Sequence, residues 1–128
     1  MVKRRTYTCG VDAAIDVMGG KWKALILWEL SEGPLRFGEL RRRMHGISER
    51  VLIVQVREME TAGLLHREQF NQVPPRVEYS LTEFGRSLLE AMMPLAEWGE
   101  RNMRIIEAIP RDGDAPADPQ PAATTATG

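Results

Sequence analysis

Arginine side chains are concentrated in the middle of the chain, where they could bind an anionic partner. Residues 36–67 contain seven arginines and four glutamates, a local net charge of +3, although the whole chain has a formal net charge of −1. A guanidinium can bond a phosphate, or the edge of a guanine, through two hydrogen bonds at once. This local excess of arginine favours a nucleic-acid contact that the overall charge hides.

Other reactive side chains are few and scattered. Cys9, His45 and His66 lie far apart in a chain of 128 residues. A metal site needs several ligands at short spacings, and covalent catalysis needs a nucleophile beside a base. Neither pattern occurs in the sequence, nor does a glycine-rich phosphate loop. We therefore expect no catalytic residue, no metal and no cofactor, and the sequence argues against an enzyme.

Four helices are expected in the first half of the chain, because apolar residues recur at intervals of three and four. Glycine or proline follows most of these runs, as is typical of helix ends. The expected helices cover residues 11–18, 21–30 and 37–44, and a fourth runs from its N-cap Ser48 to about Ala62. In the second helix the buried face is expected to comprise Trp22, Leu25, Ile26 and Leu30.

The fourth helix has two faces of opposite character. Its expected buried stripe comprises Leu52, Val56 and Met59. At about 100° per residue, Arg50, Val54 and Arg57 point to the other side. The helix is therefore expected to present two arginines to solvent.

A strand pair and a long last helix are expected to follow. Alternating apolar and polar residues predict strands at residues 65–71 and 77–81. Thr82 is expected to cap a helix that runs to about Ile109 and is kinked at Pro94. The expected buried stripe of this helix comprises Phe84, Leu88, Met92, Leu95, Met103, Ile106 and Ile109.

The end of the chain has a different composition. Residues 110–128 contain no aromatic and no large aliphatic side chain, and they carry a net charge of −2. Such a segment buries too little apolar surface to offset the entropy of ordering it. We therefore expect one folded domain at residues 1–109 and a disordered acidic tail, rich in Pro, Ala and Thr, at 110–128.

Six blocks of the sequence resemble the HxlR-type winged-helix regulators, over about residues 8–104. The blocks are Cys9-Gly-Val, Gly19-Gly-Lys-Trp22, Gly33-Pro-Leu-Arg-Phe37, Gly46-Ile-Ser-Glu-Arg50, Glu58-Met-Glu-Thr-Ala-Gly-Leu64 and Val73-Pro-Pro-Arg-Val-Glu-Tyr-Ser-Leu-Thr82. The resemblance implies a mostly α fold with a small β-hairpin wing, a winged helix-turn-helix with N- and C-terminal dimerisation helices. It also implies a bacterial transcriptional regulator, for which we favour a repressor, that forms a homodimer through its first and last helices.

The fourth helix is then the expected DNA-reading element, since an α-helix fits the major groove with its N-terminal residues facing base edges. Arg50 is placed to bond a guanine, and Arg57 to bond a phosphate. Ser48 is expected to cap the helix and to touch a phosphate. The alternative for Arg50 is a solvated side chain paired with Glu49 or Glu58.

Further DNA contacts are expected on both sides of this helix. At the hairpin, Pro74-Pro75 stiffens a loop that presents Arg76 to a phosphate or to the minor groove, unless the loop is an ordinary turn. Around the short third helix, the expected contacts to the DNA backbone are Arg36, Arg41 and Arg43.

Ile53 and Val54 depart from the family pattern, in which Thr-Gln often stands after the leucine. The two side chains could pack on thymine methyl groups, or they could be partly covered by the second helix. The departure argues against transferring a family operator sequence to this chain.

Cys9 lies just before the first expected helix and near Lys3, Arg4 and Arg5. A helix N-terminus and neighbouring cations both stabilise a thiolate and lower the pKa of a thiol. The resemblance implies that some family members sense electrophiles, quinones or oxidants through a cysteine here. Cys9 is therefore a candidate sensor, and a small buried hydrophobic residue is the alternative.

The expected function is a regulator that binds an inverted repeat in double-stranded DNA as a homodimer, with a small molecule or an electrophile as effector. The alternative is a winged-helix module that binds protein and not DNA. No apolar run is long enough to span a bilayer, and no signal core follows the charged N-terminus. We therefore expect no membrane partner and a cytoplasmic location.

Overall fold

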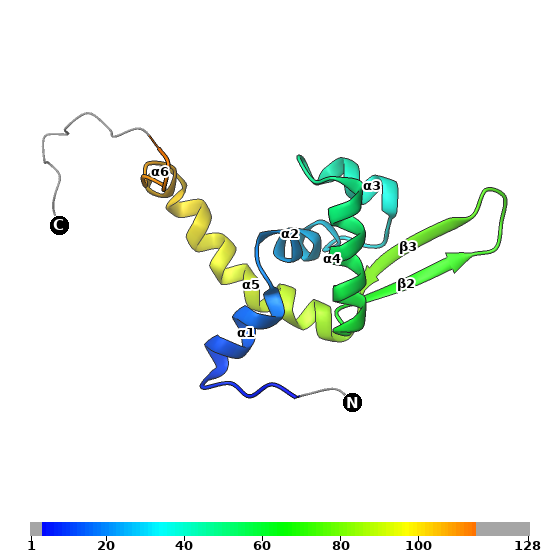
Figure 1. Cartoon of the computed structure of the whole chain (residues 1–128), viewed down its shortest axis with the longest axis horizontal. Helices are drawn as coiled ribbons and strands as arrows, with labels where there is room; N and C mark the ends of the chain where they lie inside the picture. Colours follow the sequence, from blue (N-terminus) through cyan, green and yellow to red (C-terminus); the bar gives the residue numbers. More distant parts are fainter. Residues whose placement is uncertain (1–3, 115–128) are drawn as a thin grey trace, which may run out of the picture. The chain divides into compact units, whose positions relative to one another are not determined.

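The computed structural model describes residues 4–114, and these are mostly helical (Figure 1). The helices are α1 (Gly10–Met18), α2 (Lys21–Glu29), α3 (Phe37–Arg43), α4 (Glu49–Thr61), α5 (Glu83–Arg101) and α6 (Met103–Glu107). The strands are β1 (Leu35–Arg36), β2 (Leu65–Phe70) and β3 (Arg76–Leu81). The chain divides into two compact units, of which the first ends at Met93 and the second begins at Pro94.

Apolar side chains from α2, α3, α4 and the sheet form the core of the first unit. The largest fully buried side chains are Ile26, Leu27, Leu30, Leu40, Leu52, Val56, Met59 and Leu64. The buried stripe expected on α4 is confirmed. Ser48 caps this helix as expected, since its Oγ accepts a hydrogen bond from the N–H of Val51 at 3.1 Å.

The buried face expected on α2 is partly wrong. Leu25 is 39% exposed, whereas Leu27 is fully buried beside Ile26 and Leu30. Lys23, one turn before Leu27, is also largely covered, with a side chain 14% exposed. Apolar residues surround much of this helix, so periodicity alone does not indicate which side packs.

β2 and β3 form the hairpin wing (Figure 1). The wing belongs to a three-stranded antiparallel sheet in the order β1-β3-β2. β1 has no counterpart among the expected strands, because two residues are too few to show an alternation. It pairs with β3 so that Leu35 is opposite Tyr79, and β2 pairs with β3 so that Leu65 is opposite Leu81. Leu35, Leu65 and Tyr79 are buried, which identifies the side of the sheet that packs on the helices.

A tight contact orients the start of α5. Thr82 caps this helix as expected, and its Oγ1 accepts a hydrogen bond from the N–H of Gly85 at 2.9 Å. Gly85 lies against the carbonyl of Leu64, where a Cβ would overlap the oxygen. The buried stripe expected on this helix is partly wrong, since Phe84 is 53% exposed and Gly85 and Leu89 are buried in its place. Met92 is buried as expected, and Leu88 is half-buried against the core.

The last helix is interrupted, in contrast to the single helix expected up to Ile109. α5 continues through Pro94, and Asn102 separates it from α6. The Nδ2 of Asn102 donates to the carbonyl of Trp98 at 2.9 Å, a local bond that competes with regular helix. Within the second unit Ile106 is half-buried, but Leu95, Met103 and Ile109 are exposed, so their places in the expected buried stripe are also wrong.

Part of the tail expected at residues 110–128 is described. The N–H of Arg111 donates to Oδ2 of Asp114 at 2.6 Å, and residues 115–128 lie outside the described part of the chain. Among the residues described, no helix has both the length and the apolar character that crossing a bilayer requires.

Candidate nucleic-acid interface

The outer face of α4 carries the arginines expected to contact DNA. Arg50, Val54 and Arg57 are exposed and lie opposite the buried stripe of the helix. Arg50 is in the first turn of α4, and Arg57 is about two turns further on. The helix therefore presents two guanidinium groups on one side.

The glutamates that could neutralise Arg50 are paired with other residues. Oε1 of Glu58 lies 2.6 Å from Nζ of Lys23, and Oε1 of Glu49 lies 3.4 Å from a guanidinium nitrogen of Arg41. Within residues 4–114, Arg50 forms no ion pair. The alternative in which Glu49 or Glu58 neutralises Arg50 is therefore not supported.

Ile53 and Val54 have different surroundings. Val54 is 46% exposed on the outer face of α4, so much of its side chain is open to solvent. Ile53 is half-buried and lines a groove together with Phe37 of α3 and Tyr79 of β3. Val54 is thus the better placed of the two for a thymine methyl group.

The three consecutive arginines of α3 point in different directions, as helical geometry requires. A guanidinium nitrogen of Arg43 is 4.0 Å from Oε1 of Glu29 in α2. Arg41 and Arg42 instead line a hollow at the turn into α4, together with His45. Arg42, which is not among the expected contacts, lines this hollow, whereas Arg43 does not.

Arg76 begins β3 and stacks on the hairpin itself. Its guanidinium carbon lies 4.0 Å from the ring centre of Phe70, and its Nε lies 3.4 Å from Oε2 of Glu78. The side chain of Arg76 is 26% exposed. To contact DNA, its guanidinium would have to bond a phosphate while stacked on Phe70, or leave the Phe70 ring. Arg36 is exposed in β1 and pairs in register with Glu78.

A groove lies between α4 and the wing. Its lining residues are Phe37, Glu49, Ile53, Arg57, Glu60, Arg67, Val77 and Tyr79. Arg67 is not among the expected contacts, yet it is opposite Tyr79 in the β2–β3 register, so both side chains lie on one side of the sheet. A signal for this placement exists in the sequence, because Arg67 is two residues after the apolar Leu65.

Cys9 is the N-cap residue of α1 and is exposed. The alternative of a small buried hydrophobic residue is therefore wrong. The backbone N–H groups of Asp12 and then Val11 lower the pKa of the Cys9 thiol, although the side chain does not complete a capping hydrogen bond. The sulfur is thus accessible, and its pKa is lower than that of an ordinary thiol.

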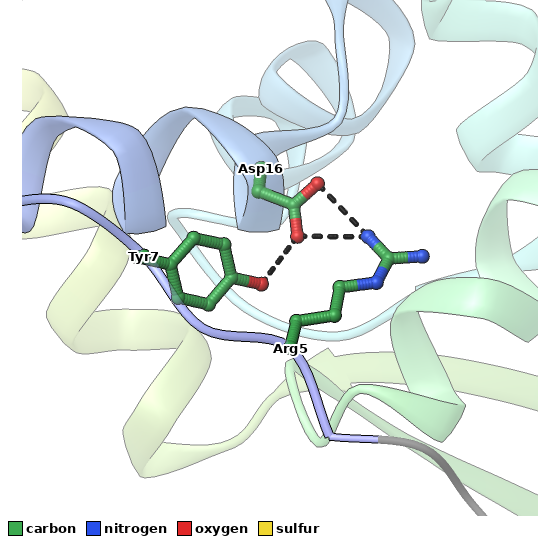
Figure 2. Close-up of polar contacts among 3 residues, drawn as sticks. All are labelled: Arg5, Tyr7 and Asp16. Carbon is green, nitrogen blue, oxygen red and sulfur yellow. Dashed lines mark hydrogen bonds and ion pairs between the residues drawn. The ribbon is translucent and has the colours of Figure 1, made fainter.

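A cluster of three residues ties the segment before Cys9 to α1 (Figure 2). A guanidinium nitrogen of Arg5 donates to both carboxylate oxygens of Asp16, at 3.0 and 2.9 Å, and Tyr7 donates to Oδ2 at 2.5 Å. The Tyr7 hydrogen bond and, next, the Arg5 hydrogen bond lower the pKa of Asp16. Arg5 is therefore paired with Asp16, in contrast to the expectation that it stabilises a thiolate at Cys9. Lys3 lies outside the described residues.

Relatives of the chain are helix-turn-helix regulators. A family model described as HxlR-like helix-turn-helix matches residues 17–107. YybR, an HTH-type transcriptional regulator of Bacillus subtilis (strain 168), is 46% identical over 105 residues, which cover 82% of this chain and 84% of YybR.

Solved structures agree with this assignment. The redox regulator HypR in its reduced form has a TM-score of 0.74 and 46% identity, over 79% of this chain and 100% of HypR. HypR in its oxidised form has a TM-score of 0.69 and 49% identity, over 73% of this chain and 97% of HypR. The expected winged-helix fold is confirmed, and the relatives are regulators and not enzymes. The chain therefore belongs to the HxlR-like helix-turn-helix family and is a transcriptional regulator of the helix-turn-helix type.

Proposed function

We propose that the chain binds double-stranded DNA sequence-specifically as a homodimer and represses transcription from the bound site. The observation that carries the proposal is the exposed guanidinium of Arg50 on α4, whose neighbouring glutamates are paired elsewhere. An α-helix fits the major groove, and an arginine near its start can bond O6 and N7 of guanine together. Ser48 and Arg57 would bond phosphates.

Exposed apolar side chains on the first and last helices support the homodimer. In the first unit, Val11 and Ile15 of α1 are 67% and 64% exposed. In the second unit, Leu95 and Trp98 of α5 and Ile105 of α6 are more than half exposed. Large apolar groups that a single chain leaves in water mark an interaction surface. Burying them against a second copy would allow two α4 helices to enter successive major grooves, ~34 Å apart.

Selection of bound duplexes from a random-sequence pool tests DNA binding. The expected product is an inverted repeat with half-sites about 10 bp apart. Its affinity should fall steeply between 50 and 200 mM salt, because bound arginines release counterions from phosphates. If the chain enriched no sequence and retained no duplex at low salt, DNA binding would be refuted. The alternative, a winged-helix module that binds protein, would then be favoured.

A reporter promoter that contains the selected site tests repression. Expression of the chain should lower transcription of the reporter, and Arg50→Ala should restore it. Unchanged or increased transcription with the wild-type chain would refute the repressor role.

We also infer that Cys9 senses electrophiles or oxidants. Its thiol is exposed with a lowered pKa, and the similar HypR is described as a redox regulator with reduced and oxidised forms. A benzoquinone would add to the thiolate by forming one C–S bond, and protonation would give a thioether of the hydroquinone. Treatment should change the affinity of the wild-type chain for the selected duplex and leave that of Cys9→Ser unchanged. Equal wild-type affinity before and after complete alkylation would refute sensing.

A further inference from the structure

The groove between α4 and the wing is lined by residues of two classes. The buried and half-buried ones are apolar or aromatic, namely Phe37, Ile53, Val77 and Tyr79. The exposed ones are charged, namely Glu49, Arg57, Glu60 and Arg67. An apolar floor with two arginines on its rim fits a ligand that has an apolar side and an anionic side, and the two glutamates of the rim oppose such a ligand.

We propose that one sugar–phosphate strand of the bound DNA lies in this groove, where Arg57 and Arg67 hold its phosphates from two sides. The inference rests on the proposed DNA-binding function and adds Arg67 to it. One backbone strand separates the major groove, which α4 would occupy, from the adjacent minor groove at the hairpin. The deoxyribose rings of that strand supply the apolar side of the ligand, and its phosphates supply the anionic side.

The two arginines approach the groove from different elements. Arg67 comes from β2, on the same side of the sheet as the buried Tyr79. Its guanidinium Nη2 is 3.4 Å from Oε1 of Gln69, a long hydrogen bond that a phosphate oxygen would replace favourably. Arg57 comes from the outer face of α4, and neither arginine forms an ion pair in the part of the chain that the structure describes.

The two carboxylates of the groove differ in their surroundings. Glu49 is paired with Arg41 at 3.4 Å, which compensates part of its charge. Glu60 has no cationic partner among residues 4–114. A phosphate strand in the groove would therefore meet the uncompensated charge of Glu60, and removing that charge should strengthen binding.

The experiment compares full-length variants on two duplexes, the selected one and an unrelated one of equal length, between 50 and 200 mM NaCl. Arg67→Gln should weaken binding to both duplexes by a similar factor of several-fold. It should also reduce the slope of log affinity against log salt by about 1.8, the value for one lost phosphate contact in each protomer of the dimer. Glu60→Gln should strengthen binding to both duplexes. Arg86→Gln, which removes the same charge from α5 outside the groove, is the matched control.

The outcomes separate this inference from the proposed function. If the wild-type chain binds the selected duplex but Arg67→Gln behaves like Arg86→Gln, the groove does not hold the strand and the inference is overturned. A loss of affinity confined to the selected duplex would overturn it as well, because that result would mean that Arg67 reads bases. If the wild-type chain binds neither duplex at 50 mM NaCl, the proposed function and the inference fail together.

Discussion

Lys23 joins α2 to α4 through two hydrogen bonds from one ammonium group. Its Nζ lies 2.6 Å from Oε1 of Glu58 and 3.0 Å from Oε1 of Gln55. Because the side chain of Lys23 is 14% exposed, the contact is sheltered on the α2 side. The contact fixes α4 on the core and withdraws Glu58 from the arginines of the outer face.

Lys23→Met should lower the free energy of unfolding by about 1 kcal/mol. Methionine keeps the apolar stem but loses both hydrogen bonds. A hydrogen bond with a charged group contributes roughly 1.5–3 kcal/mol when it is shielded from water. Glu58 is 57% exposed, so water compensates part of the loss. Urea denaturation followed by circular dichroism measures the change.

Lys21→Met is the control for this bridge. Lys21 is exposed and lies over the ring of Trp22 at 4.9 Å, so its loss should cost about 0.5 kcal/mol. Equal destabilisation by the two variants would show that the bridge to α4 adds nothing beyond a surface lysine.

Gly85→Ala should destabilise the chain by about 3 kcal/mol, near the upper end for overpacking. The new Cβ would overlap the carbonyl oxygen of Leu64, and a backbone atom cannot rotate away. Gly99→Ala is the matched control in the same helix, because nothing lies within 4 Å of a Cβ there. It should stabilise the chain by about 0.5–1 kcal/mol, since alanine favours helix over glycine. Thermal melts of the two variants should therefore shift in opposite directions.

Local sequence signals were sufficient for α4. Ser48 is a strong N-cap, and the spacing of Leu52, Val56 and Met59 leaves one choice of buried face, so the outer position of Arg50 follows. The burial of Leu27 in place of Leu25 does not follow from such signals, because several faces of α2 are apolar and tertiary packing decides between them.

Contacts between distant segments explain the other differences. Gly85 has no side chain and so contributes nothing to a hydrophobic pattern, yet its fit against Leu64 sets which side of α5 is buried. Arg76 stacks on Phe70 because the hairpin register places them opposite each other, and its sequence neighbours do not reveal this partner. Arg67 could have been found by extending the alternation from Leu65.

Tyr7→Phe should raise the pKa of Asp16 toward its ordinary value. The Tyr7 hydrogen bond is the largest cause of the lowered pKa of Asp16, and the Arg5 hydrogen bond is the next. Because folding lowers this pKa, Asp16 stabilises the folded chain above the unfolded-state pKa, about 3.9. That contribution is lost as the pH falls through the lowered pKa. Titration of the Asp16 carboxyl carbon by NMR measures the shift, and Arg5→Gln should produce a smaller one. An unchanged pKa in Tyr7→Phe would mean that the phenol does not bond the carboxylate in solution.

Arg50→Ala should weaken binding to the selected duplex by about 1–3 kcal/mol for each half-site, because each protomer of the dimer loses its bidentate contact to guanine. The variant should lose its preference for that base pair while keeping the salt slope nearly unchanged, in contrast to the loss of a phosphate contact. Sedimentation should show the same dimer as the wild-type chain, since Arg50 lies on the outer face of α4 and not on α1 or in the second unit. Arg86→Ala serves as the control for charge. If Arg50→Ala bound the selected duplex as tightly and as selectively as the wild-type chain, α4 could still lie in the major groove, but Arg50 would not be the residue that reads it.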